Sequence, residues 1–218
     1  KSDGTVRQQA LKAFNNIYEY YGGVIDWSRY HEDFQNSVIK PRLEKFDDEN
    51  LQQPSSILKI IAYWSNDVKL YEFLYYNNFA NVKALMLTLI NNNVKESVVG
   101  VILKFVKNLI ENVDDSELYA EMVALVVSNS LAKLPLLFTL DMSPETSNVA
   151  VELLLNIEKL GFIENKETKL LIIDSLTNAL DFNNKKISQN NISKVLVILG
   201  SLIQNFDGLD FEMIKVLY

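Results

Sequence analysis

Apolar residues recur with a helical period along almost the whole chain. The clearest case lies between Ser188 and Phe206, where one stripe contains Ile192, Val195, Leu196, Leu199, Leu202, Ile203 and Phe206. Such spacing is typical of an amphipathic helix. Similar patterns predict helices over residues 2–21, 28–40, 54–64, 68–75, 81–91, 95–112, 115–127, 130–140, 144–160, 165–180 and 188–206. The sequence therefore predicts an all-α protein.

Several helix ends are marked by residues that cap helices. The run Ser143-Pro144-Glu145 combines an N-cap, a proline at the first helical position and an acid that the helix dipole favours. Ser116 supplies a cap before the helix that follows it, and Gly161 lies where a helix would stop. These signals place the predicted helices in pairs with short connections.

The pairs recur at an irregular spacing. They begin near Asn77, Ser116, Ser143 and Ser188, so the gaps are about 39, 27 and 45 residues. Two of the gaps lie close to the period of about 40–47 residues of helical-hairpin solenoids. We therefore expect a HEAT-like α-solenoid of stacked antiparallel helix pairs, and the alternative is a compact helical bundle without repeats. Residues 1–218 are expected to form one segment of a much larger solenoid protein, with a possible break at residues 47–53.

Composition narrows the function classes. The 218 residues include 7 Gly and 4 Pro, too few for the many tight turns of an all-β sandwich. The absence of Cys excludes disulfides and thiolate chemistry, and a single His excludes histidine-based metal clusters. The longest uncharged run, residues 195–206, is shorter than the roughly 20 residues of a membrane span. We expect no membrane segment, and the start without Met suggests an excised piece of a longer protein.

The charge is acidic and unevenly distributed. The net charge is −7, and residues 111–158 contain nine acids and one base, Lys133. A docking face for a basic protein is one interpretation, centred on Asp114, Asp115, Glu117 and Glu121. The other interpretation is that these acids form an ordinary solvated helix surface.

Basic residues cluster only weakly. They are Lys40, Arg42 and Lys45 in one place and the Lys185–Lys186 pair in another. Phosphate binding requires a local basic surface, and the acids at residues 47–49 dilute the first cluster. These five cations could make weak contacts with RNA or a partner, or could simply be solvated.

No constellation of catalytic residues is present. His31 has Glu32 and Asp33 beside it, but adjacent residues on a helix do not face each other. Neither a nucleophile–base set nor a glycine-rich phosphate loop occurs in the sequence. We expect no enzyme activity, no cofactor, no metal site and no small-molecule substrate.

One stretch carries a family resemblance. Residues 41–46 read Pro-Arg-Leu-Glu-Lys-Phe, residues 49–59 read Glu-Asn-Leu-Gln-Gln-Pro-Ser-Ser-Ile-Leu-Lys, and residues 63–67 read Tyr-Trp-Ser-Asn-Asp. The span 41–67, 27 residues that include these stretches, resembles the down-regulated-in-metastasis family, very large HEAT-repeat proteins of the U3 small nucleolar ribonucleoprotein and the small-subunit processome. The resemblance implies a nucleolar, and thus nuclear, scaffold for pre-18S rRNA processing and small ribosomal subunit assembly, and it carries over no catalytic residues.

Two functions remain open at this stage. The resemblance implies a scaffold whose partners are processome proteins and the pre-ribosomal particle. The alternative is another HEAT-type adaptor, such as a transport or phosphatase scaffold that binds other proteins. Because the chain is acidic, we expect direct RNA binding by this segment to be weak or absent. For the fold, we expect Trp64 to be buried and Trp27 to be at least partly exposed.

Overall fold

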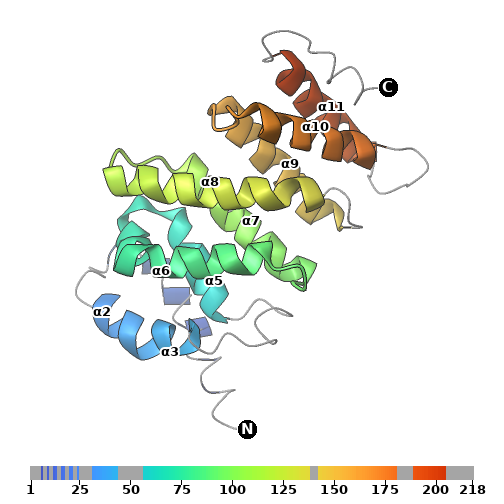
Figure 1. Cartoon of the computed structure of the whole chain (residues 1–218). Helices are drawn as coiled ribbons and strands as arrows, with labels where there is room; N and C mark the ends of the chain where they lie inside the picture. Colours follow the sequence, from blue (N-terminus) through green and yellow to red (C-terminus); the bar gives the residue numbers. More distant parts are fainter. Residues whose placement is uncertain are drawn as a thin grey trace. The chain divides into compact units, whose positions relative to one another are not determined.

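The regular structure of the chain is helical throughout its described part. The computed structural model describes residues 31–43, 56–137, 142–180 and 189–204, together with isolated residues between 6 and 24, and these contain no strand (Figure 1). The chain divides into two compact units, Lys1–Val126 and Val127–Tyr218. The possible break at residues 47–53 and Trp27 lie outside the described residues.

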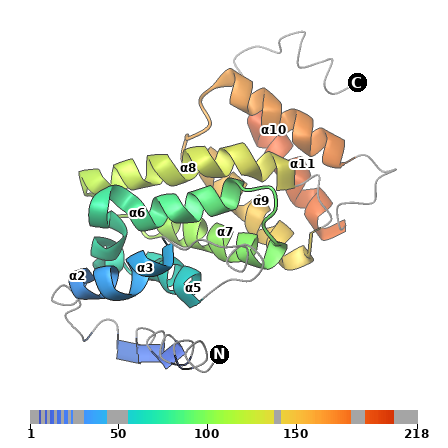
Figure 2. The same cartoon turned by 60° about the horizontal axis from the view of Figure 1, so that its bottom comes forward.

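The first unit is built from helices that pack on one another in chain order. Its elements are α2 (His31–Phe34), a π-helical turn (Gln35–Ile39), α3 (Lys40–Leu43), α5 (Ser56–Tyr63), two 3₁₀ turns (Trp64–Asn66 and Val68–Leu70), α6 (Tyr71–Ile90), α7 (Glu96–Glu111) and the first part of α8 (Glu117–Leu137). Helix α5 packs on α7, and α6 contacts both (Figure 2).

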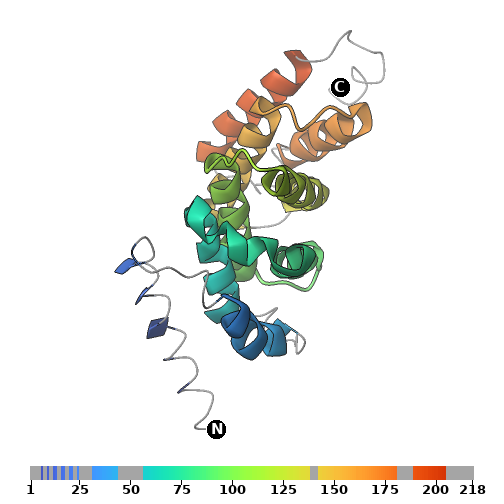
Figure 3. The same cartoon turned by 90° about the vertical axis from the view of Figure 1, so that its left-hand side faces the viewer.

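The second unit repeats this arrangement. It contains the rest of α8, then α9 (Pro144–Lys159), α10 (Lys166–Ala179) and α11 (Gln189–Gln204). Helix α9 packs on α11, and α10 contacts α11 (Figure 3). In each unit, therefore, a helix lies against the next helix but one in the chain, as it does in stacked helix pairs.

Helix α5 shows how the apolar period fixes its buried side. Ile57, Leu58, Ile61 and Trp64 are buried, whereas Lys59 is exposed. Trp64 has no exposed surface, and its ring stacks on that of Phe73 with the centroids 4.7 Å apart. The predicted burial of Trp64 is confirmed.

Hydrogen bonds between helix pairs join residues that are separated by a similar number of positions along the chain. Gln35 bonds to Asn81, 46 residues away, and Asn66 bonds to Asn108, 42 residues away. In the second unit Lys194 bonds to Asn148, 46 residues away, and Ser201 bonds to Glu158, 43 residues away. These separations match the solenoid period of about 40–47 residues. The expected α-solenoid is confirmed in preference to a bundle without repeats.

Helix α6 is interrupted where the sequence pattern separates two helices. Asn77, Asn78 and Phe79 have φ values of 48°, 53° and 60°, so the chain makes a left-handed turn between residues 71–75 and 80–90. Asn adopts this conformation more easily than most residues because its short side chain can bond locally. The two Asn side chains are exposed, while Phe79 is buried.

We expect the turn to tolerate glycine and to reject a β-branched residue. Asn78→Gly should change the free energy of unfolding by less than about 0.5 kcal/mol, and Asn78→Val should lower it by about 1–2 kcal/mol. The control is Lys83→Val, an exposed position in the regular part of α6, which should cost no more than about 0.7 kcal/mol. Urea denaturation measures all three variants, and equal effects of the two valines would contradict the left-handed turn.

Helix ends follow the predicted caps. The Ser143 Oγ accepts a hydrogen bond from the Thr146 amide at 3.3 Å, and Ser116 Oγ accepts one from the Tyr119 amide at 3.2 Å. Helix α9 ends at Lys159, and Gly161, two residues further on, has a φ of 76° and an amide that donates to the Glu158 carbonyl. This is the left-handed C-terminal residue that favours glycine.

Two expectations about helices are wrong. Residues 115–127 and 130–140 were expected to form two helices, but α8 runs unbroken from Glu117 to Leu137. Packing of its apolar residues outweighs the weak helix propensity of Ser128 and Asn129, and Pro135 lies in the last turn, where its ring interrupts only the end of the helix. In α11, Leu196 belongs to the expected buried stripe but is 55% exposed.

Within the described residues, no helix combines the length and apolar character needed to cross a bilayer.

Candidate functional site

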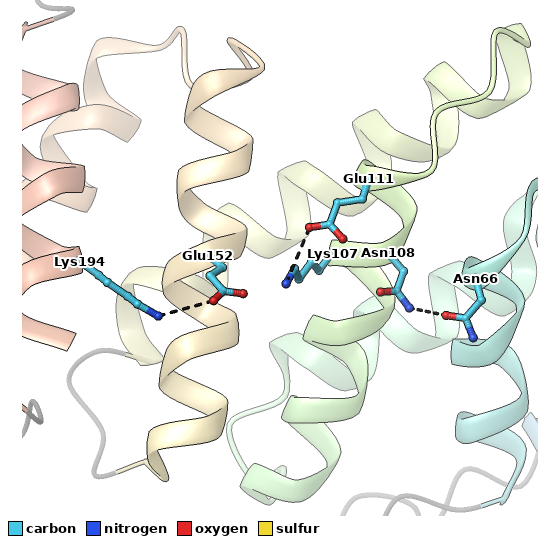
Figure 4. A network of polar contacts seen from close by, with 6 residues as sticks. All are labelled: Asn66, Lys107, Asn108, Glu111, Glu152 and Lys194. Atoms are coloured by element: carbon cyan, nitrogen blue, oxygen red, sulfur yellow. Dashed lines mark hydrogen bonds and ion pairs between the residues drawn. The ribbon is translucent and has the colours of Figure 1, made fainter. Parts of the chain in front are cut away.

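Polar side chains make contacts on the surface of each unit, both between helical elements and within one helix (Figure 4). In the first unit Asn108 Nδ2 donates to Asn66 Oδ1 at 2.6 Å, and Lys107 Nζ lies 3.8 Å from Glu111 Oε1 on the same helix. In the second unit Lys194 Nζ lies 3.6 Å from Glu152 Oε1. Ion pairs as exposed as these contribute only about 0–1 kcal/mol each. The contacts of Asn66 with Asn108 and of Lys194 with Glu152 join two helical elements, whereas that of Lys107 with Glu111 lies within α7, and none of them forms an acid–base pair in a cleft.

The predicted acidic face lies at the start of α8. Asp115, Glu117 and Glu121 are exposed, and Asp114 is half-buried in the connection that precedes the helix. Acids are favoured here because the N-terminal end of a helix carries a partial positive charge. The structure thus brings the four predicted residues together and leaves three of them in solvent.

Asp114 differs from the other three acids because neighbouring groups hold it. Its Oδ2 accepts hydrogen bonds from Ser116 Oγ at 2.7 Å and from Tyr75 Oη at 2.9 Å. These two bonds lower the pKa of Asp114 below its ordinary value, and the bond from Ser116 has the larger effect. Burial raises the pKa of Tyr75 to about 12. Asp114 is therefore a structural carboxylate that links α6 to the connection before α8.

This pairing predicts a pH dependence at both ends of the scale. Because the folded-state pKa of Asp114 is lowered, its contribution to stability is present above the ordinary carboxyl pKa of about 4 and is lost as the pH falls through the folded value. Because the pKa of Tyr75 is raised, its contribution is present below about pH 10 and is lost as the pH rises through about 12.

Tyr75→Phe should therefore raise the pKa of Asp114 and reduce the loss of stability between pH 10 and 12. Carboxyl-carbon NMR titration measures the first effect, and denaturation against pH measures the second. Tyr76→Phe is the matched control, since the Tyr76 hydroxyl donates to Asn36 Oδ1 rather than to Asp114. An Asp114 pKa that is unchanged in Tyr75→Phe would show that the bond does not form.

The tyrosines around Asp114 hold the helices together. Tyr71 Oη donates to the carbonyl of Asn112 at 2.9 Å, and Tyr119 Oη donates to that of Leu109 at 3.1 Å. The rings of Tyr71 and Tyr119 are nearly parallel, with centroids 6.0 Å apart. Tyr71 is buried, so its ring offers no platform for a nucleic acid base.

The predicted basic residues are not brought together by the described structure. Lys40 is exposed in α3, and Arg42 lies in the same helix. Lys45, Lys185 and Lys186 lie outside the described residues. His31 begins α2, and its side chain is likewise not described. These residues stay predictions.

A buried pair of amide side chains was not predicted from the sequence. Gln35 Nε2 donates to Asn81 Oδ1 at 3.0 Å, and Asn81 Nδ2 donates back to Gln35 Oε1 at 2.8 Å and to the Phe73 carbonyl at 3.2 Å. Both side chains are buried. The sequence signal was available, because each amide occupies a position where the helical period calls for an apolar residue.

A second buried polar group lies on α8. The Ser130 hydroxyl is buried without a hydrogen-bond partner, and Lys133 lies one turn further along the helix and is also buried. Burial lowers the pKa of Lys133. Among the described residues, His, Asp and Glu nowhere gather in a group of three or more that could hold a metal ion.

The fold and these contacts define the class of protein. Helices that stack in pairs, with hydrogen bonds between residues 39–47 positions apart, make an α-helical repeat protein of the solenoid type. Such proteins present extended surfaces to their partners.

Comparison with known proteins identifies the family. Residues 3–216 match the family model described as "U3 small nucleolar RNA-associated protein 20, N-terminal". The chain is 37% identical over 207 residues, 95% of its length, to U3 small nucleolar RNA-associated protein 20 of Saccharomyces cerevisiae. The chain therefore belongs to this family, and the resemblance that residues 41–67 carry is confirmed. The chain covers 8% of the length of the yeast relative.

Proposed function

We propose that this chain is a non-catalytic scaffold segment of a small-subunit processome protein, which supports pre-18S rRNA processing and small ribosomal subunit assembly. The observation that carries the proposal is the similarity along 95% of the chain to a protein named for its association with U3 small nucleolar RNA. The same similarity favours the nucleolus as the location of this chain and processome proteins as its partners. It favours this function over a transport or phosphatase adaptor.

The polar chemistry of the described residues supports a scaffold rather than an enzyme. Asp114, the acid with the lowered pKa, is engaged by Tyr75 and Ser116, while Glu117 and Glu121 project into solvent. Perturbed groups at active sites are arranged to transfer protons to a substrate. The polar contacts described above instead hold one helix pair to the next.

The acidic face is the surface that we propose for a protein partner. Asp115, Glu117 and Glu121 form an exposed negative surface at the start of α8, in a chain whose net charge is −7. A basic protein segment would be attracted to it, whereas an RNA backbone would be repelled. Direct RNA binding by this segment is therefore weak or absent, and other parts of the particle contact the rRNA.

Affinity purification of the full-length parent protein tests the proposal. The parent should co-purify U3 RNA and pre-18S rRNA, and deletion of this segment should reduce recovery of particle proteins and lower the ratio of mature 18S to precursor rRNA. Recovery of transport cargo or phosphatase subunits, without U3 RNA, would establish the adaptor function instead.

Charge reversal then tests the acidic face separately. The triple substitution Asp115→Lys, Glu117→Lys and Glu121→Lys should weaken protein recovery and leave the helical fold intact. The matched control reverses two exposed acids of α10, Glu167→Lys and Asp174→Lys. Equal recovery in both variants would eliminate the acidic face as a docking surface.

A further inference from the structure

Helix α6 has a second apolar side, which faces solvent. Leu87 is 66% exposed and Ile90 is 39% exposed. The buried side of the same helix is already formed by Val82, Leu85, Met86 and Leu89. A surface helix ordinarily has polar residues opposite its buried side, as α7 does. The exposed positions of α7 include Ser97, Lys104 and Glu111. The departure from this rule is therefore particular to α6.

The exposed residues of α6 form one continuous stripe. Lys83, Leu87 and Ile90 follow one another at steps of four and three residues, which places them on successive turns of one side of the helix. At a rise of about 1.5 Å per residue, this α6 stripe is about 10 Å long. Ala84 beside it is partly exposed, and its small side chain lets another helix approach closely. The α6 stripe can thus contact about two turns of a partner helix.

The charge around the α6 stripe is positive. Residues 73–95 contain two lysines, Lys83 and Lys95, and no acid, although the whole chain has a net charge of −7. Both lysines are exposed, and no described residue forms an ion pair with Lys83. Complementary charge attracts a partner and like charge repels one. The α6 stripe therefore suits an acidic partner that also has apolar side chains.

We propose that the α6 stripe binds an acidic amphipathic helix of a protein partner. Apolar residues one turn apart on that helix pack on Leu87 and Ile90, and a carboxylate on the next turn pairs with Lys83. RNA is a poorer occupant, because aliphatic side chains offer no ring for base stacking and two lysines neutralise few phosphates. The contact rests on the proposed scaffold function, and it adds a partner of opposite charge to the one that suits the acidic face.

Photocrosslinking in the full-length parent protein tests the proposal. The photoreactive residue p-benzoylphenylalanine, in place of Leu87, should crosslink to a protein segment that has excess Asp and Glu and apolar residues at helical spacing. Mass spectrometry identifies the segment. Lys83→Glu should lower the yield of this product by about fivefold or more, because it places like charges together. Lys59→Glu, at an exposed position of α5, is the matched control and should leave the yield unchanged.

Several outcomes would overturn the proposal. One is a crosslink to RNA, to this chain or a second copy of it, or to a segment without excess acids. Another is a yield no higher than that from the same photoreactive residue in place of Lys104, which is exposed on α7. Equal yields in Lys83→Glu and Lys59→Glu would also contradict it. Recovery of U3 RNA with the parent tests the scaffold function separately, so U3 RNA without the crosslink would contradict the α6 contact alone.

Discussion

Replacing Trp64 by alanine is expected to lower the free energy of unfolding of the first unit by about 3–5 kcal/mol. The side chain is completely buried, and its ring stacks on Phe73 at an interplanar angle of 16°. Truncation removes a large apolar surface and leaves a cavity that the helices around α5 can fill only in part. Urea denaturation followed by circular dichroism measures the loss, which is a large fraction of the stability that a domain ordinarily has.

Two variants make this result specific. Trp64→Phe keeps an aromatic ring next to Phe73 and should cost less than Trp64→Ala. Val68→Ala, at an exposed position four residues further along the chain, should change stability by no more than about 0.5 kcal/mol. An unchanged denaturation midpoint for Trp64→Ala would mean that the register of α5 is wrong.

Replacing Asn81 by leucine should produce the second largest loss. The substitution leaves the Gln35 amide and the Phe73 carbonyl without the partners that Asn81 supplies. A buried donor or acceptor that loses its partner costs about 1–3 kcal/mol. Although leucine adds apolar surface, we expect a net loss of about 2–3 kcal/mol, measured by the same denaturation.

A double-mutant cycle distinguishes this cause from a simple packing defect. Gln35→Leu combined with Asn81→Leu removes both amides, so the double variant should be more stable than the sum of the single losses predicts. Asn36→Leu is the control beside Gln35, because its side chain is exposed. Strictly additive losses would show that the two amides are not paired in solution.

Helix boundaries proved predictable where local chemistry decides them. The caps at Ser116, Ser143 and Asn165 and the stop at Gly161 depend on hydrogen bonds within a few residues, so the sequence contains all the information. The break between residues 75 and 81 was expected from the apolar pattern, and the left-handed turn lies inside it.

Features that depend on distant residues were not predictable. Helix α8 runs through Ser128 and Asn129 because tertiary packing outweighs their weak propensity. The pairing of Gln35 with Asn81 joins residues 46 positions apart, and an apolar period cannot show which polar residues will meet across that distance. Leu196 fits the apolar stripe of its helix but is 55% exposed.

The candidate site was predicted in part. The acidic cluster at the start of α8 is visible in the sequence because four acids lie within eight residues, and three of them are exposed, while a docking role for them stays a prediction. The distinct role of Asp114 was missed, since it arises from Tyr75 on another helix, 39 residues earlier. A local run of acids in the sequence indicates an acidic surface. Only the folded structure shows which of these acids, such as Asp114, is held by hydrogen bonds to another helix.

The most direct test of the central claim is a binding titration of this chain against structured pre-rRNA. We expect the segment to bind neighbouring proteins and, with a net charge of −7, to have too few clustered cations to bind RNA tightly. We predict weak binding at low salt that fades steeply toward physiological salt, because only a few phosphates could be neutralised. Sub-micromolar affinity at physiological salt, lost on charge reversal at Arg42 and Lys45, would contradict it.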